Sequence, residues 1–319
     1  MALSKALVVG GTGFLGRALC IHLHRQGWEV SSYSRRLPEK IDQAPGIRYV
    51  AAFETENEAL EDEISKNEVV FNLANANIPA LSNNEIMEDI NRTVGLNIRL
   101  LQMCVKHKIR NYIFASSGGT VYGPAENFPI QEQSATNPLV AYGINKLVCE
   151  KYIGLFHHNY GLNYTILRIA NPFGPGQSPF TGQGIIAKYL HASLSESDFV
   201  IFGDGSSTRD YIYVDDVSRA FECVVKYEGP HKIFNVGLGH GLSINELMEC
   251  ANRILDRKPA IKYVGQRTID VGKNYLDVSL IGRECGWEPL HSIEEGLAKT
   301  LEWMRHRYFM PFSPSSSRD

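Results

Sequence analysis

The chain has 319 residues, of which 44% are hydrophobic and 21% charged, so it is long enough to fold as one large domain with a smaller lobe. Its formal net charge of -3 excludes a broad basic surface for nucleic acid or an anionic membrane, and no long apolar run predicts a membrane-spanning helix. The cysteines lack the C-x-x-C spacing of a zinc site, so we expect free thiols and no metal; they are Cys20, Cys104, Cys149, Cys223, Cys250 and Cys285.

The first predicted strand, 6–9, is apolar and leads into a glycine loop and then a helical pattern. This order is typical of a dinucleotide site, because glycines let the backbone approach a pyrophosphate at the N-terminus of the helix. The spacing is G-x-x-G-x-x-G rather than the G-x-G-x-x-G of dehydrogenases. The candidate cofactor residues in this loop are Gly10, Gly13, Phe14, Leu15 and Gly16. A strand this close to the start leaves no room for a signal peptide, so we expect a cytoplasmic protein.

The second predicted strand, 28–33, ends without the acidic residue that usually binds the adenosine ribose of NAD. Ser34, Arg35 and Arg36 follow it instead. Two guanidinium groups beside small hydroxyls suit a 2′-phosphate, which favours NADP over NAD. The alternative is a pair of solvated arginines in a loop.

The next segments continue to alternate between strand and helix, which indicates a parallel sheet. We predict strands at 47–51 and 69–74 and helices at 54–66 and 83–107. The long helix has a core-facing apolar face, in which Asn91 is a polar exception or a surface asparagine. Leu73, Ala74 and Asn91 are further candidate cofactor-binding residues.

A cluster of small hydroxyl residues follows the strand predicted at 111–115, where doubly wound sheets bind ligands. Ser116 and Ser117 begin this cluster, which taken alone also suits a plain turn. Tyr142 and Lys146 then lie four residues apart, on one face of a predicted helix. A nearby ammonium favours the phenolate, so we expect Lys146 to lower the pKa of Tyr142 and make it a base.

Three motifs in this order resemble the extended short-chain dehydrogenase/reductase family, particularly nucleotide-sugar 4-epimerases such as UDP-glucose 4-epimerase. They are Gly10-x-x-Gly13-x-x-Gly16, Ser116-Ser117 with Val121-Tyr122-Gly123, and Tyr142-x-x-x-Lys146. The resemblance spans nearly the whole chain and continues through the segments 168–176, 202–216 and 287–289.

The resemblance implies an α/β fold, with a Rossmann-type doubly wound parallel sheet and a smaller C-terminal α/β substrate lobe. We expect an NAD(P)-binding domain at 1–170, to which later segments return, a mainly nucleotide-sugar-binding lobe at 171–308 and a loose tail at 309–319. Ser243 with Glu246 and Ser292 with Glu295 have capping-box spacing, and the acidic pair at 215–216 is a candidate cap for a helix that runs to residue 227.

The family's catalytic roles are carried over onto three positions. Tyr142 is the base, Lys146 binds the nicotinamide ribose and lowers the tyrosine pKa, and a hydroxyl after the fifth strand binds the reacting sugar oxygen. Counting from the strand selects Ser117, whereas counting back from Val121 selects position 118, which is glycine here. We choose Ser117 and keep Thr120 as an alternative.

The family also implies the substrate contacts. Asn171 is expected at the sugar nucleotide, Arg209 and Arg267 at its diphosphate, where a bidentate guanidinium fits, and Asp270 at its ribose. Tyr211 is expected near the base. The full predicted substrate set is Ser117, Thr120, Asn171, Phe202, Arg209, Tyr211, Arg267 and Asp270.

Several activities fit this triad. The preferred activity is a 4-epimerase that passes through a transient 4-keto sugar, acting as a homodimer with NAD or NADP and with a nucleotide sugar as its partner. A 4-keto-sugar reductase uses the same groups and is favoured somewhat by Arg35 and Arg36. A 4,6-dehydratase is less expected, because the family's dehydratases carry Asp-Glu where this chain has Gly118 and Gly119. A non-catalytic dinucleotide sensor would not need the intact triad.

Overall fold

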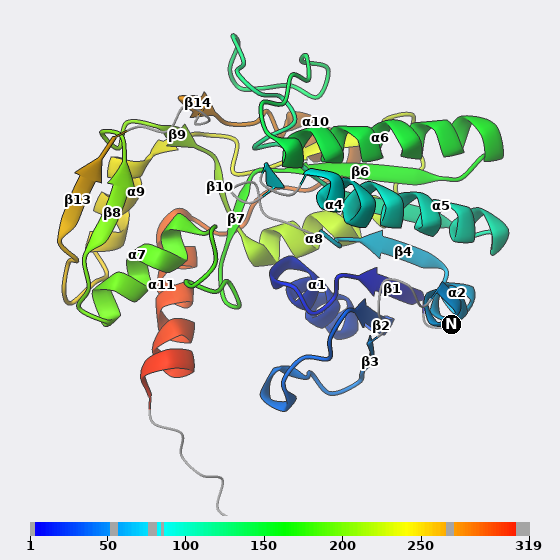
Figure 1. Ribbon diagram of the computed structural model, residues 1–319, viewed down its shortest axis with the longest axis horizontal. Coiled ribbons are helices and arrows are strands. Elements are labelled where there is room, and N and C mark those ends of the chain that lie inside the picture. The colour runs from blue at the N-terminus through cyan, green and yellow to red at the C-terminus, as the bar shows by residue number, and fades with distance from the viewer. Residues whose placement is uncertain (1–3, 52–56, 76–81, 84–85, 266–270, 311–319) are drawn as a thin grey trace, which may run out of the picture.

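The computed structural model describes residues 4–51, 57–75, 82–83, 86–265 and 271–310. Its centre is a seven-stranded parallel sheet in the order β11-β6-β5-β4-β1-β2-β3 (Figure 1). The order reverses between β1 and β4, which confirms the predicted doubly wound Rossmann-type fold. The strands are β1 (Lys5–Val9), β2 (Glu29–Ser34), β3 (Ile47–Ala51), β4 (Val69–Asn72), β5 (Asn111–Ser117), β6 (Tyr164–Ile169) and β11 (Ile233–Val236).

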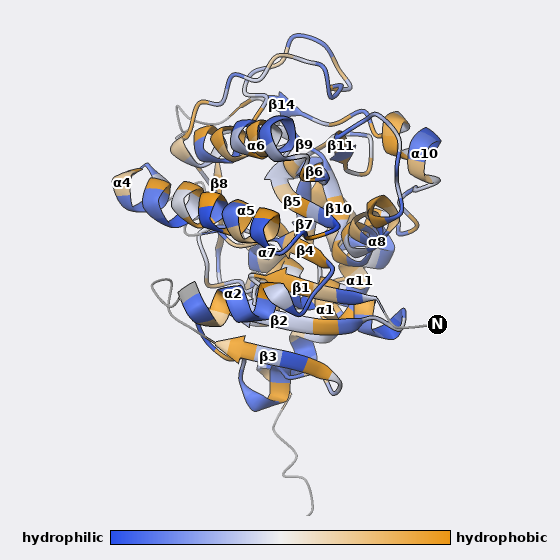
Figure 2. Ribbon diagram, turned by 90° about the vertical axis from the view of Figure 1, so that its right-hand side faces the viewer, coloured by the Kyte–Doolittle hydropathy of each residue, from blue (hydrophilic) through white to orange (hydrophobic). Residues whose placement is uncertain are grey.

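Helices cover both faces of this sheet, and each face buries its own apolar cluster. One layer contains α1 (Phe14–Arg25) and α8 (Val214–Val225), which pack against each other. The other contains α2 (Asn57–Ser65), α5 (Leu96–Lys106) and α6 (Ala141–Tyr160). In Figure 2, α5 and α6 lie to the left of the sheet and α8 to its right. Because both faces are covered, the central strands are buried along most of their length rather than at alternate positions; β4 is buried at every position.

The helix predicted at 83–107 is interrupted by a π-helical turn. It consists of α4 (Ile86–Asp89), the π-helix η2 (Ile90–Gly95) and α5. A π-turn inserts a residue into the helical repeat, so the apolar face before it no longer matches the face after it. Val94 is buried, but Ile86, which we expected to face the core, is 50% exposed. That part of the prediction was wrong.

The smaller lobe is formed by short strands and helices after β6 and lies on the left in Figure 1. Its strands form small pairs, β7 with β10, β8 with β13, and β9 between β12 and β14. The strands are β7 (Asn171–Phe173), β8 (Phe199–Phe202), β9 (Thr208–Arg209), β10 (Tyr211–Tyr213), β12 (Leu242–Ser243), β13 (Ile261–Val264) and β14 (Lys273–Asn274). The helices of this part are α7 (Ile185–Leu194), α9 (Ile244–Asn252), α11 (Ile293–Met304) and the π-helix η3 (Arg305–Phe309). Two further elements belong to the main domain: α10 (Ser279–Cys285) packs against β11, and a short 3-10 helix, η1 (Lys40–Asp42), follows β2.

Both predicted capping boxes are present. Ser243 accepts from the backbone of Glu246 at the start of α9, and Ser292 does the same with Glu295 at the start of α11. The predicted acidic cap of α8 is wrong, because Tyr213 occupies the N-cap position. The Asp216 carboxylate instead accepts from the backbone N–H groups of the segment before α11, at 3.0 and 3.1 Å, so it joins α8 to the C-terminal part of the chain.

The chain returns to the main sheet after residue 171, since β11 pairs with β6 and α8 packs on α1. The division at 170 and 171 stays a prediction. Phe309, the first residue of the predicted tail, belongs to η3, and residues 311–319 lie outside the described part. No helix in the described ranges is long and apolar enough to span a membrane.

Candidate functional site

The glycine loop forms a tight backbone cradle at the end of β1. Gly10 has φ +85°, and a Cβ at that position would lie 2.8 Å from the Ala74 nitrogen. A Cβ at Gly16 would lie only 2.1 Å from the Gly10 carbonyl oxygen. The helix α1 begins at Phe14, and no side chain caps it. The backbone N–H groups of its first turn are therefore left to bind a ligand. The loop therefore fits the pyrophosphate of a dinucleotide cofactor.

Of the other predicted cofactor residues, some contact this cradle and others are exposed to solvent. The Ser34 hydroxyl accepts from the backbone of Thr12 at 3.1 Å, so it also shapes the loop. Arg35 and Arg36 follow β2 and are exposed. Leu73 and Ala74 follow β4 against the backbone of the loop, whereas Asn91 is exposed near the start of η2. The sites predicted from β1, β2 and β4 thus share the carboxyl edge of the sheet.

The predicted triad converges on the end of β5. Ser117 is the last residue of β5, and its side chain lines a cavity together with Tyr142 from α6. Lys146 is 2% exposed and donates from Nζ to the carbonyl oxygen of Ala115 at 2.8 Å. Its Nζ lies 5.7 Å from the centroid of the Tyr142 ring. The three side chains are therefore held together by one strand and one helix.

The expected effect on the pKa of Tyr142 is not seen. Burial raises the pKa of Tyr142, and the buried carboxylate of Asp89 raises it further. Burial also lowers the pKa of Lys146 to about 8. The correction has a physical cause: the apolar surroundings disfavour charge on both groups, and the ammonium is directed at Ala115 rather than at the phenol oxygen.

Asp89 was missed because nothing in its local sequence distinguishes it from a surface acid. It is 1% exposed, and it accepts from Ser82, from Thr93 at 3.1 Å and from Asn145 at 2.9 Å. Since Asn145 lies on α6 directly before Lys146, this carboxylate fixes the helix that carries the triad. A buried charge needs such partners, which is why the hydrogen bonds surround it.

Position 118, one of the two positions that counting selects for the catalytic hydroxyl, has space only for glycine. A Cβ at Gly118 would lie 2.5 Å from Leu276 and 3.0 Å from the Arg168 carbonyl oxygen, so a serine does not fit there. Ser117 lines the cavity, and so does Thr120, whose buried hydroxyl has no hydrogen-bond partner among the described residues. Both predicted hydroxyls therefore remain at the site.

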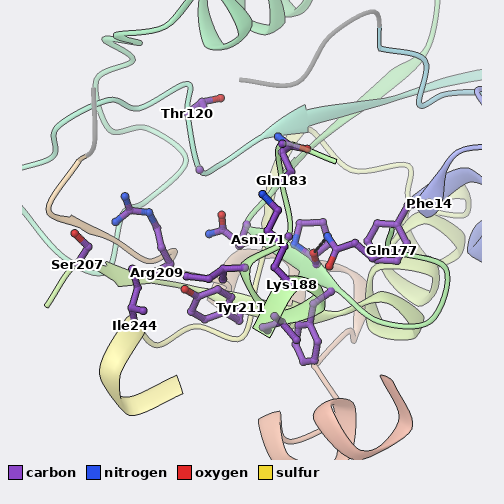
Figure 3. A pocket seen from close by; sticks show the side chains of 18 of the residues that line it. Phe14, Thr120, Asn171, Gln177, Gln183, Lys188, Ser207, Arg209, Tyr211 and Ile244 are labelled. Atoms are coloured by element: carbon purple, nitrogen blue, oxygen red, sulfur yellow. Dashed lines mark hydrogen bonds between the residues drawn. The ribbon is translucent and has the colours of Figure 1, made fainter. Parts of the chain in front are cut away.

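The cavity of about 490 Å³ lies between the end of the main sheet and the smaller lobe (Figure 3). Nine predicted residues line it, namely Phe14, Leu15, Ser117, Thr120, Tyr142, Asn171, Phe202, Arg209 and Tyr211. Arg267 and Asp270 lie outside the described residues. Figure 3 shows Arg209, Ser207 and Ile244 at one end and Phe14 at the other.

Other lining residues were not predicted, because no motif assigns a role to them. The polar ones are Gln177, Gln183, Lys188 and Ser207. In the described lining, Lys188 and Arg209 are the basic side chains, and no Asp or Glu is present. The cavity is thus suited to an anionic ligand such as a diphosphate. Lys188 lies on α7, and no pattern in its local sequence distinguishes it from other lysines.

Asp210 supports the wall behind the cavity. It is fully buried, and its carboxylate accepts from the backbone of Leu238 at 2.7 Å, of Leu276 at 3.2 Å and of Gly239 at 3.3 Å. Burial raises its pKa to about 6. Its carbonyl oxygen also accepts from the Asn171 side chain at 2.9 Å. Three distant segments are therefore joined directly behind Arg209 and Asn171.

The family model described as "NAD dependent epimerase/dehydratase family" matches residues 6–237. The chain belongs to this family. It is an enzyme of the extended short-chain dehydrogenase/reductase type, in the nucleotide-sugar epimerase group, and it uses an NAD(P) cofactor. The glycine cradle described above fits that cofactor.

Similar proteins agree with this assignment. The chain is 32% identical to a putative UDP-glucose 4-epimerase of Methanocaldococcus jannaschii, covering 94% of this chain and 98% of that protein. It is 30% identical to a dTDP-4-dehydro-6-deoxyglucose reductase of Escherichia coli, covering 94% and 97%. The structure of a UDP-glucose 4-epimerase of Thermotoga maritima with UDP-glucose is similar with a TM-score of 0.89 and 34% identity, covering 95% and 99%.

Proposed function

We propose that this enzyme is a nucleotide-sugar 4-epimerase acting through a transient 4-keto sugar. The observation that carries the proposal is that Ser117 and Tyr142 open into the same cavity as Asn171, Arg209 and Tyr211. A single site thus offers acid–base groups for a sugar carbon and contacts for a nucleotide diphosphate. Similarity to the epimerases of M. jannaschii and T. maritima supports the same activity.

Bound NAD(P) would supply the acceptor and donor of the hydride. The glycine loop and the first turn of α1 would hold its pyrophosphate, and Lys146 its nicotinamide ribose. Tyr142 would take the proton of the C4 hydroxyl and return it after the keto sugar has turned over. Ser117 would hydrogen-bond the same oxygen, with Thr120 as the alternative hydroxyl. Because burial raises the pKa of Tyr142, its phenolate would be a strong base toward the C4 hydroxyl, and the phenol so formed would return the proton to the C4 oxygen once the hydride is back on the sugar.

The proposed substrate contacts rest on the cavity lining and, for Arg267 and Asp270, on the family resemblance. Arg209 would bind the diphosphate together with Arg267, and Asp270 would bind the ribose. Asn171 would contact the sugar nucleotide, while Phe202 and Tyr211 would lie beside the base. Lys188 adds a second basic side chain to the described lining, which supports an anionic substrate.

The second candidate is a reductase of nucleotide 4-keto sugars. The E. coli relative and the exposed Arg35 and Arg36 after β2 favour it, because two guanidinium groups suit the 2′-phosphate of NADPH. Dehydration across C5 and C6 needs a further acid and base beside the catalytic hydroxyl. Gly118 and Gly119 occupy that place, and the described lining has no carboxylate, which argues against a dehydratase.

We also propose a homodimer in the cytoplasm. The outer face of α6 carries exposed apolar side chains, with Ile144 47%, Leu155 46% and Tyr152 36% exposed. A second copy that packs against this face would remove them from water. Light scattering after size exclusion tests the dimer: Leu155→Glu should give a monomer, whereas Leu139→Glu, on an exposed loop residue, should not.

The epimerase and the reductase are separated by the fate of the hydride. Purified enzyme is incubated with UDP-glucose, UDP-galactose and their N-acetyl forms, without added reductant. We expect interconversion of C4 epimers with no net change in absorbance at the nicotinamide band, and no interconversion by Tyr142→Phe. Stoichiometric loss of NADPH on a 4-keto nucleotide sugar, with no epimer formed from any of the four substrates, would establish the reductase instead.

A further inference from the structure

A second cavity, of about 550 Å³, lies away from the proposed active site and contains two cysteines. It is lined by the C-terminal halves of α1 and α8 and by the end of α10, and it shares no lining residue with the first cavity. Cys223 belongs to α8 and Cys285 ends α10. The family assignment and the proposed mechanism use neither residue.

The two cysteines are in direct contact across this cavity. Cys223 Sγ donates to the carbonyl oxygen of Cys285 at 2.7 Å, although the residues are 62 positions apart in the sequence. Both are free and partly exposed, unlike Cys20, Cys104 and Cys149, which are buried. A pair that is close in space and open to a cavity can be reached by a small reagent and can also react within itself.

The two sulfurs differ in their surroundings. A hydrogen bond with the Cys285 side chain lowers the pKa of Cys223, and Arg219 and Lys226, one turn away on either side, also lower it, against the opposite effects of burial and of Glu222. The same contact raises the pKa of Cys285. Since the thiolate is the nucleophile, we expect Cys223 to attack the reagent first and Cys285 to attack the resulting mixed disulfide.

We propose that Cys223 and Cys285 form a reversible redox site that reacts with low-molecular-weight disulfides such as oxidised glutathione. The Cys223 thiolate attacks one sulfur of the reagent, whose S–S bond breaks and releases one thiol. The Cys285 sulfur, as it loses its proton, attacks the mixed disulfide at Cys223 and releases the second thiol. The chain thereby loses two protons and two electrons, and the reagent is reduced to two thiols.

The resulting crosslink would join α10 to the helix layer of the main sheet. The segment that precedes α10 reaches the proposed active site, because the Asn274 side chain donates to the Gly118 carbonyl oxygen at 3.1 Å. Leu276 fills the space beside Gly118. The crosslink therefore anchors the far end of the segment that supports the residues after Ser117.

Peptide mapping by mass spectrometry tests the site. Intact protein is equilibrated with mixtures of oxidised and reduced glutathione, alkylated and digested. We expect one crosslinked peptide, Cys223–Cys285, which dithiothreitol removes. Cys285→Ser should retain glutathione on Cys223, whereas Cys223→Ser should leave Cys285 unmodified. Cys250→Ser is the matched control, because Cys250 is also partly exposed, and it should behave like the wild type.

Two results would overturn the proposal: no crosslinked peptide in the wild type with excess oxidised glutathione, or a crosslink that involves another cysteine. Peptide mapping of the wild type tests the proposal even if a variant fails to fold. The Tm gives an independent readout, since closing a long loop should raise it by roughly 5–10 °C relative to the reduced protein. A lower Tm would also overturn the proposal, because it would show that the two residues are not placed for the bond.

Discussion

The cradle at the end of β1 and the cavity beside the smaller lobe lie next to each other but are built differently. The cradle is made of backbone, with glycines because a Cβ at Gly16 would overlap the Gly10 carbonyl. The cavity is lined by side chains from several segments, such as Asn171, Lys188 and Arg209. A backbone site suits one ligand shared by a whole family, whereas a side-chain site can change with each substrate.

The largest effect is expected where the two regions meet. Tyr142→Phe removes one hydroxyl at the boundary between cradle and cavity, so it should lower kcat by roughly 10²–10⁴ while folding and cofactor affinity stay nearly unchanged. Steady-state kinetics and calorimetric titration of the cofactor measure both quantities. A loss of less than about tenfold would count against Tyr142 as the acid–base group.

The cradle should lose affinity for NAD(P) when a side chain displaces its backbone. Gly16→Ala places a Cβ 2.1 Å from a carbonyl oxygen, so we expect a loss in NAD(P) affinity on the order of 100-fold, about 2.7 kcal/mol. Gly95→Ala is the matched control: its Cβ would meet nothing closer than Arg99 at 3.6 Å. Equal affinity of both variants, measured by calorimetry on folded protein, would refute a backbone-built cofactor site.

The cavity should respond to a change of side chain without any effect on the cradle. Arg209→Met should raise the KM for the nucleotide sugar about 10- to 100-fold, because a hydrogen bond to a charged group contributes roughly 1.5–3 kcal/mol. Cofactor affinity should not change. Arg253→Met, at an exposed arginine on α9's end, is the control and should leave both unchanged. A matching loss of cofactor affinity in Arg209→Met would show that the two regions are not separable.

A smaller effect tests a part of the cofactor region that is built by side chains. Changing Arg35 and Arg36 together to Ala should weaken NADP binding about tenfold, because only NADP presents the 2′-phosphate that guanidinium groups pair with. NAD binding should stay the same. Calorimetric titration with both cofactors measures the two affinities. A wild-type enzyme that binds NAD more tightly than NADP would contradict the NADP assignment.

The smallest effect is expected from Asp89→Asn, which alters charge beneath the triad without touching either ligand region. The carboxylate raises the pKa of Tyr142 and of Lys146, so its removal should lower both. The acid limb of the pH–kcat profile should then move to lower pH by about one unit or less. An unmoved profile in a variant of unchanged urea stability would show that Asp89 has only a structural role.

The difference between a backbone site and a side-chain site also explains which features can be predicted from the sequence. Gly10, Gly13 and Gly16 are recognisable because a backbone turn requires them at fixed spacing, and Tyr142 with Lys146 because one helix face fixes their separation. The parallel sheet follows from the alternation of strands and helices. These features depend on residues near one another in the chain.

The unpredicted features depend on contacts between distant segments. Lys188 and Asp89 acquire their positions only when α7 and α4 pack, so their local sequence has no distinguishing pattern. Asp216 looks like a helix cap but instead binds the backbone before α11. The pKa of Tyr142 was predicted from one neighbour, whereas burial by the whole site determines it.

One contact described above gives the triad a mechanical property. Lys146 is hydrogen-bonded to the Ala115 carbonyl oxygen, and Ser117 lies two residues further along the same strand. The positions of both side chains are therefore tied to β5. That strand is hydrogen-bonded on both sides, by β4 and β6, and such core strands open locally only at a high cost in free energy. The spacing between Ser117 and Lys146 is therefore set by the main sheet and does not depend on the side chains of the smaller lobe.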